Sequence, residues 1–123
     1  MTIEVTHPVT ATTNGTQLRS YMRALSVVEQ IMSQAPVMPT SVDVIVHPWA
    51  AGQPEVRFYF HRDPKSLRAF AAELLMEVST EDRTTDEVYT EARVIAGQDV
   101  RVMAWSLSPR PVEQGVESPE VAA

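Results

Sequence analysis

The sequence predicts an α+β fold, a two-layer sandwich in which an antiparallel-rich four-stranded sheet carries two helices on one face. Two stretches repeat apolar residues every three or four positions, as one side of a helix does. Four shorter stretches alternate apolar and polar residues, as strands do. The predicted order is helix, strand, strand, repeated twice, so each half of the chain brings one helix and one hairpin to the sheet.

The two ends of the chain are expected to lie outside a single domain at residues 16–107. Residues 1–15 are rich in Thr and are expected to form a flexible arm or, over Ile3 and Val5, a short edge strand. Residues 108–123 combine prolines and glutamates without periodicity, which predicts a disordered tail.

The first helix is predicted over residues 16–34, with Thr16 as its N-cap. Pro36 and Pro39 end it, because proline cannot continue the hydrogen-bond ladder. Its apolar stripe consists of Leu18, Tyr21, Met22, Leu25, Val28 and Met32. We expect this stripe to face the sheet.

The first hairpin is predicted from strands at residues 41–47 and 55–61, joined by the loop 48–54. If His47 lies opposite Glu55, the apolar residues of both strands fall on the same face of the sheet. These residues are Val42, Val44, Val46, Val56, Phe58 and Phe60.

The second helix is predicted over residues 62–78 and is the element around which the fold is arranged. Asp63 can accept a hydrogen bond from an unpaired backbone N–H, and Pro64 is suited to the first helical position. The buried stripe comprises Leu67, Phe70, Ala71, Leu74 and Val78. A polar connection is expected over residues 79–87.

The segment Leu67-Arg68-Ala69-Phe70 in this helix matches Leu18-Arg19-Ser20-Tyr21 in the first helix. The match indicates either an internal duplication or the convergence of two amphipathic helices on one pattern. Both explanations are compatible with the predicted fold.

The second hairpin is predicted from strands at residues 87–95 and 100–107, with Gly97-Gln98 as a two-residue turn. This register places Val94 opposite Arg101. The side chains expected to face the helices are then Val88, Ala92, Val94, Met103, Trp105 and Leu107.

The opposite face of the sheet is too apolar to be wetted throughout, and contiguous apolar patches tend to mark contacts. We therefore predict an interface with a second copy of the chain or with another protein. The predicted interface residues are Ile45, Arg57, Tyr59, Tyr89, Arg93, Ile95, Val100 and Val102. Arg57 and Tyr59 also suit stacking on single-stranded RNA, but a net charge of −6 opposes binding to phosphates, so the sequence disfavours a nucleic-acid partner. The alternative function is small-molecule or nucleotide binding in a cleft near Trp49, in the loop of the first hairpin.

The residues that carry catalysis or bind metals are sparse. The chain has no cysteine, and its three histidines include His47 and His61 at opposite ends of the first hairpin. Six residues at about 3.3 Å each separate this pair by about 20 Å, too far to share one ion. The acidic run at residues 81–87 lacks the spacing of a calcium loop, and neither G-x-S-x-G nor a glycine-rich phosphate loop is present. We therefore predict a non-enzymatic protein with no cofactor and no metal.

Targeting signals are also missing from the sequence. No apolar run reaches the ~20 residues of a membrane span, and the first residues do not follow the charged-then-apolar order of a signal peptide. Together with the absence of cysteine, this predicts a cytoplasmic location without a membrane partner.

Three segments carry a resemblance to other proteins: Val42-Asp43-Val44, Leu67-Arg68-Ala69-Phe70-Ala71 and Val100-Arg101-Val102-Met103-Ala104-Trp105. Through these segments, the region 16–107 as a whole resembles small uncharacterised proteins of actinobacteria and their phages. The resemblance implies an accessory role in a phage or mobile element, and it implies no activity and no functional residue.

Overall fold

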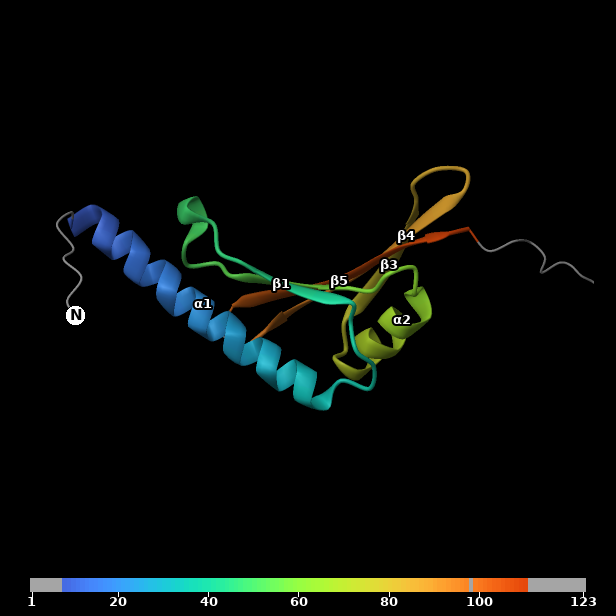
Figure 1. Ribbon diagram of the computed structural model, residues 1–123, viewed down its shortest axis with the longest axis horizontal. Helices are drawn as coiled ribbons and strands as arrows, with labels where there is room; N and C mark the ends of the chain where they lie inside the picture. Colours follow the sequence, from blue (N-terminus) through green and yellow to red (C-terminus); the bar gives the residue numbers. More distant parts are fainter. Residues whose placement is uncertain (1–7, 98, 111–123) are drawn as a thin grey trace, which may run out of the picture.

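A computed structural model describes residues 8–97 and 99–110 of the chain, and for residues 8–13 it describes only the backbone. Two α-helices and five strands confirm the α+β class. The elements are α1 (Pro8–Gln34), β1 (Ser41–Ile45), the 3₁₀ turn η1 (Pro48–Ala50), β2 (Glu55–Tyr59), α2 (Pro64–Glu73), β3 (Glu77–Asp82), β4 (Glu87–Ala96) and β5 (Val100–Pro109). Both helices lie on the same side of the sheet, and no other element of the described residues covers the opposite side (Figure 1).

The sheet has five strands in the order β1-β2-β5-β4-β3, so the prediction of four strands was wrong. The β2 and β5 strands are parallel, and the other neighbours are antiparallel. The additional strand, β3, occupies the end of the predicted helix and the first four residues of the predicted polar connection. Val78 is its one apolar residue, and the other five side chains are exposed. A charged edge strand of this kind discourages pairing with the sheet of another molecule.

The core lies between the sheet and both helices, and its aromatic part lies under α2. Phe70 of α2 has its ring centroid 5.0 Å from that of Phe58 and 5.1 Å from that of Phe60, and all three side chains are buried. The α2 helix begins as predicted: the Asp63 carboxylate accepts a hydrogen bond from the backbone N–H of Ser66 at 3.1 Å. Hydrogen bonding with the Ser66 side chain, followed by this backbone bond, holds the pKa of Asp63 below its usual 3.8.

The α2 helix ends at Glu73, five residues earlier than predicted. Leu75 has a φ of 55°, in the left-handed region, and this breaks the helical path. The backbone N–H of Met76 then donates to the carbonyl of Ala71 at 2.9 Å, which closes the helix end. Val78 therefore reaches the core from β3 and not from the helix.

The α1 helix begins at Pro8 and not at Thr16, so the second half of the predicted arm is helical. The edge strand expected over Ile3 and Val5 lies outside the described residues. With 27 residues, α1 is about 40 Å long. Its buried side chains are Ser20, Ala24, Val27 and Ile31.

The register of the first hairpin differs from the predicted register by two residues. Val44 pairs with Val56, and Val42 pairs with Phe58. Because side chains alternate with a period of two, an even shift leaves every side chain on its predicted face. The predicted core face of this hairpin is therefore correct.

The register of the second hairpin differs by one residue, because its loop has three residues (97–99) and not two. Gly97 and Asp99 both have positive φ, at 54° and 66°. Val94 consequently pairs with Val102 in place of Arg101, and every side chain of β5 changes face. The predicted interface residues Val100 and Val102 are buried in the core. Met103, Trp105 and Leu107, predicted to be core residues, lie on the uncovered face.

The last described residues belong to the fold, although the sequence predicts a tail from residue 108. Strand β5 continues to Pro109. The backbone N–H of Arg110 donates to the carbonyl of Asp86 at 2.6 Å, and its guanidinium lies 3.2 Å from the Asp82 carboxylate. The rest of the predicted tail, residues 111–123, lies outside the described part of the chain.

Candidate interaction surfaces

The side of the sheet that neither helix covers is here called the open face. Six of the eight predicted interface residues lie on it: Ile45, Arg57, Tyr59, Tyr89, Arg93 and Ile95. Val100 and Val102 do not, for the reason given above. Sequence reasoning missed Met103, Trp105 and Leu107, and the length of the loop at residues 97–99 is the signal that would have revealed them.

A row of aromatic side chains crosses the open face from β2 through β5 to β4, and we call it the aromatic row: His61, Tyr59, Trp105 and Tyr89. The Trp105 ring centroid lies 4.4 Å from that of Tyr59 and 6.2 Å from that of Tyr89. The Tyr59 hydroxyl lies 2.6 Å from Nδ1 of His61, which extends the row past the end of β2. At the other end, the Arg83 guanidinium lies 4.2 Å from the centre of the Tyr89 ring.

Polar groups beside the aromatic row are paired with one another. Glu55 forms an ion pair with Arg57 at 3.1 Å, and Glu91 forms one with Arg93. The hydroxyl of Tyr89 donates a hydrogen bond to Glu91 at 2.8 Å. The charges next to the rings therefore already have partners, which lowers the cost of removing water from this face on contact.

These pairs shift the acid–base equilibria of the open face. The hydrogen bond from Arg93 holds the pKa of Glu91 below its usual range. Partial burial, followed by the Glu91 hydrogen bond, raises the pKa of Tyr89 to about 12. At neutral pH, Tyr89 is thus a hydrogen-bond donor and Glu91 a charged acceptor, an arrangement that fixes the position of the Tyr89 ring.

Trp49 lies on η1, at the end of the first hairpin, and its side chain is 81% exposed. Its ring stacks on His47, with centroids 4.6 Å apart and planes 13° from parallel. A cavity of about 600 Å³ lies beside it and includes Ile95, Asp99 and Arg101 in its walls. An aromatic face, a cation and a carboxylate therefore surround one shallow site, as the predicted alternative function requires.

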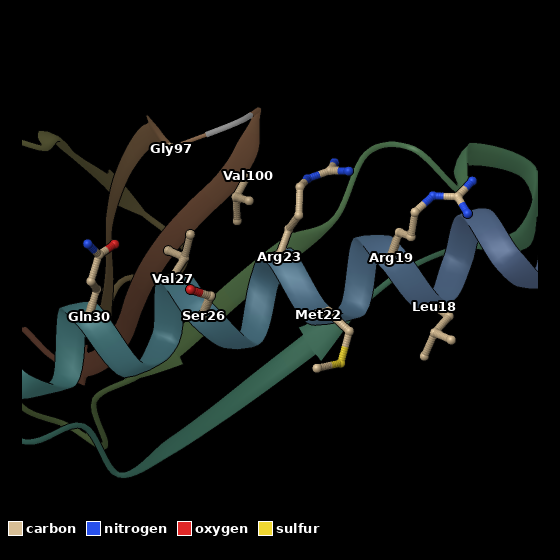
Figure 2. A pocket seen from close by; sticks show the side chains of 9 residues that line it. All are labelled: Leu18, Arg19, Met22, Arg23, Ser26, Val27, Gln30, Gly97 and Val100. Carbon is tan, nitrogen blue, oxygen red and sulfur yellow. The ribbon is translucent and has the colours of Figure 1, made fainter.

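A larger cleft, of about 820 Å³, lies between α1 and the tip of the β4–β5 hairpin (Figure 2). Arg19, Arg23 and Val27 line it from the helix, and Gly97 and Val100 line it from the hairpin. The Arg23 guanidinium donates through NH2 to the Gly52 carbonyl at 3.1 Å, while its Nε is buried without a hydrogen-bond partner. Within residues 8–97 and 99–110, no three His, Asp or Glu side chains gather as metal ligands do.

The second apolar surface is on α1, and we call it the α1 face: Leu18, Tyr21, Met22 and Leu25. These side chains are 62%, 37%, 58% and 49% exposed, respectively. They are four of the eight large hydrophobic side chains exposed in the described part of the chain. The sequence predicted them to face the sheet, and that prediction was wrong.

The α1 face is exposed because another side of α1 is fixed to the protein. Ala24, Val27 and Ile31 pack into the core. Gln17 donates a hydrogen bond to the carbonyl of Val46 at 3.0 Å, and Ser20 donates one to the carbonyl of Ala51. These contacts hold the helix by one side and turn the α1 face away from the sheet.

Comparison of the chain with protein-family models and with curated proteins finds no match. None of the helices in the described residues combines the length and the apolar character needed to cross a membrane.

Proposed function

We propose that this protein is a small non-enzymatic protein–protein interaction module that self-associates through the open face of its sheet. The observation that carries the proposal is the aromatic row, in which Tyr59, Trp105 and Tyr89 meet on a face that neither α1 nor α2 covers. Aromatic side chains are enriched at the centres of protein interfaces, where they bury a large area at a low cost in conformational entropy.

The chemistry of the open face supports binding more than catalysis. The pKa values of Glu91 and Arg93 are shifted mainly by their hydrogen bond to each other, and that of Tyr89 by partial burial followed by its hydrogen bond to Glu91, so these groups form a paired network on an open surface. A catalytic acid or base is ordinarily found in a cleft, with its pKa shifted toward the working pH. Ion pairs on an open surface are instead suited to orienting a binding partner and to making the contact specific.

Sedimentation velocity from about 1 μM to about 100 μM, a range in which micromolar complexes dissociate, tests the proposal. The parent protein should shift from monomer to a larger species. Tyr59→Ala and Ile95→Arg should keep their far-ultraviolet spectra and form smaller species than the parent at the same concentration, because both residues lie on the open face.

Leu75→Arg is the matched control, because Leu75 is an exposed apolar residue that directly follows the end of α2 and belongs to no strand of the open face. It should associate like the parent. A parent that stays monomeric throughout the range, or open-face variants that associate normally, would contradict the proposal.

The second candidate function is small-molecule or nucleotide binding beside Trp49, favoured by the exposed indole and the adjoining cavity. The chain has two tryptophans, so Trp105→Phe leaves Trp49 as the single reporter. In that background, micromolar nucleotide should quench the fluorescence if the site binds it, and Arg101→Ala should weaken the effect. An unchanged emission spectrum would exclude nucleotides as ligands of this site.

The biological setting that we propose is an accessory role in a phage or mobile element. Its support is the sequence resemblance of residues 42–44, 67–71 and 100–105. The genes that flank the coding sequence test it: neighbouring structural or integration genes of a phage would support the assignment, and a conserved metabolic operon would contradict it.

A further inference from the structure

Three residues of the α1 face, Leu18, Met22 and Leu25, begin a longer series along α1 that has the spacing of a helix-pairing seam. Leu18, Met22, Leu25, residue 29 and Met32 follow one another at steps of four, three, four and three, which is the repeat by which two helices interlock. Glu29 occupies the fourth of these positions. A solvated helix would place polar residues at such positions, so the pattern indicates contact with another helix.

The same protomer covers the C-terminal end of this seam, where Met32 is partly buried against the core, but it leaves Leu18, Met22 and Leu25 exposed. Ala24, Val27 and Ile31 are already buried against the core, and they lie on a different side of the helix. Figure 2 shows Leu18 and Met22 pointing away from α1 in the direction opposite to Arg19 and Arg23, although all four are among the residues that line the cleft near the β4–β5 tip. Within residues 8–97 and 99–110 the protomer has no further α-helix that could pair with this seam, and we infer a partner helix from another molecule.

The charges along α1 select the orientation of that partner. In a parallel pair each residue lies beside its own copy, so the seam would bring Glu29 next to a second Glu29. In an antiparallel pair centred on Leu25, Leu18 lies opposite Met32, and Glu29 lies opposite Tyr21. Arg19 of the second copy then lies within one turn of Glu29, on the same side of the pair. Only the antiparallel arrangement gives opposite charges a partner.

We propose that two copies of this protein pair through the α1 face, with their α1 helices packed antiparallel about Leu25. The proposal rests on the self-association proposed above, and it adds a second contact that is separate from the open face. Each contact has twofold symmetry, so a protomer that uses both is joined to two different neighbours.

Single cysteines test the geometry directly, because the chain has no cysteine of its own. A disulfide forms when two Cβ atoms approach to about 3.5–4.5 Å. Under mild oxidation, Leu25→Cys should form a covalent dimer, and a mixture of Leu18→Cys with Met32→Cys should cross-link. Leu18→Cys alone should not, because the antiparallel pair keeps its two copies apart. Leu75→Cys, an exposed site after α2, measures random collision.

Cross-linking of Leu18→Cys alone as efficiently as Leu25→Cys would overturn the antiparallel orientation. Cross-linking of Leu25→Cys no better than Leu75→Cys would overturn the α1 contact altogether. If the protein then still associates and Ile95→Arg abolishes the association, the proposed function stands without this inference. A chain that stays monomeric at every concentration contradicts both.

Charge exchange provides a second readout that a structural defect would not reproduce. Arg19→Glu and Glu29→Arg should each weaken the dimer by about 3-fold or more, since each dimer loses two exposed pairs. The double variant restores opposite charges and should recover the parent affinity. Failure of the double variant to recover would show that Arg19 and Glu29 do not meet across the contact.

Discussion

The two helices carry the same short pattern and use it in opposite ways. Leu67 and Phe70 in α2 are fully buried, whereas Leu18 and Tyr21, at the matching positions of α1, are exposed. The α2 helix has one apolar side, and this side is taken up by Phe58 and Phe60 of the sheet. A similar spacing of apolar residues therefore does not determine whether a stripe becomes core or surface.

The difference arises from a second apolar side that only α1 possesses. Ala24, Val27 and Ile31 lie next to the shared pattern on the helix surface, and they are the residues that reach the sheet. Ala24 is small enough to let the helix backbone approach closely. Because this side of α1 is buried, Leu18 and Tyr21 of the shared pattern stay exposed and can contact another molecule.

The largest expected effect is on the free energy of unfolding, and it distinguishes the matching positions of α2 and α1. Phe70→Ala removes a ring from the centre of the core and should lower the free energy of unfolding by about 3–5 kcal/mol. Tyr21→Ala, at the matching position of α1, should change it by less than about 1 kcal/mol. Urea unfolding at low protein concentration, where association is weak, measures both. Equal losses would show that the α1 face is part of the core.

An intermediate effect tests which side of α1 is fixed to the sheet. Ala24 is fully buried, so Ala24→Leu overfills its site and should cost about 1–3 kcal/mol. Ser26 is exposed on the same helix, and Ser26→Leu should leave the unfolding midpoint nearly unchanged. Thermal or urea melts of the two variants give the comparison. The reverse order of stabilities would mean that α1 is rotated about its axis.

The smallest effect concerns how the helices start. The lowered pKa of Asp63 means that its carboxylate stabilises the fold above pH 3.8, and that this contribution is lost as the pH falls through the folded-state pKa. Asp63→Ala should therefore lower the melting temperature at neutral pH, and the difference from the parent should close in acid.

Thr16→Ala is the matched change on α1 and should not lower the melting temperature, because Thr16 lies inside the helix and Ala is the better helix former. A difference between Asp63→Ala and the parent that persists below the folded-state pKa would show that the carboxylate charge is not the cause.

The parts of the fold that the sequence predicted correctly depend on strong local signals. The Asp63-Pro64 start of α2, its core residues Leu67 and Phe70, and the strands of the first hairpin are of this kind. The register of that hairpin was wrong by two residues, but the period of two made the error harmless to the choice of faces.

The failures have equally local causes. One extra loop residue at 97–99 inverted the faces of β5, so Trp105 was predicted to be a core residue and Val102 an interface residue. Strand β3 has one apolar residue, Val78, and forms only because β4 pairs with it. The α1 face is exposed because another side of the helix contacts the sheet. The spacing of apolar residues in the α1 face alone cannot predict those contacts.

The position of β5 has a consequence for how the protein is made. It is the last strand of the described chain, yet it lies at the centre of the sheet, with Glu55 of β2 on one side and Arg93 of β4 on the other. While the ribosome is still producing β5, the β1–β2 and β3–β4 hairpins exist as two half-sheets with no strand to join them. Late, long-range pairing of this kind slows folding and exposes apolar surface to aggregation. We therefore expect a nascent chain that stalls before Val100 to be a substrate for chaperones and proteases, and the completed chain to fold in a single late step.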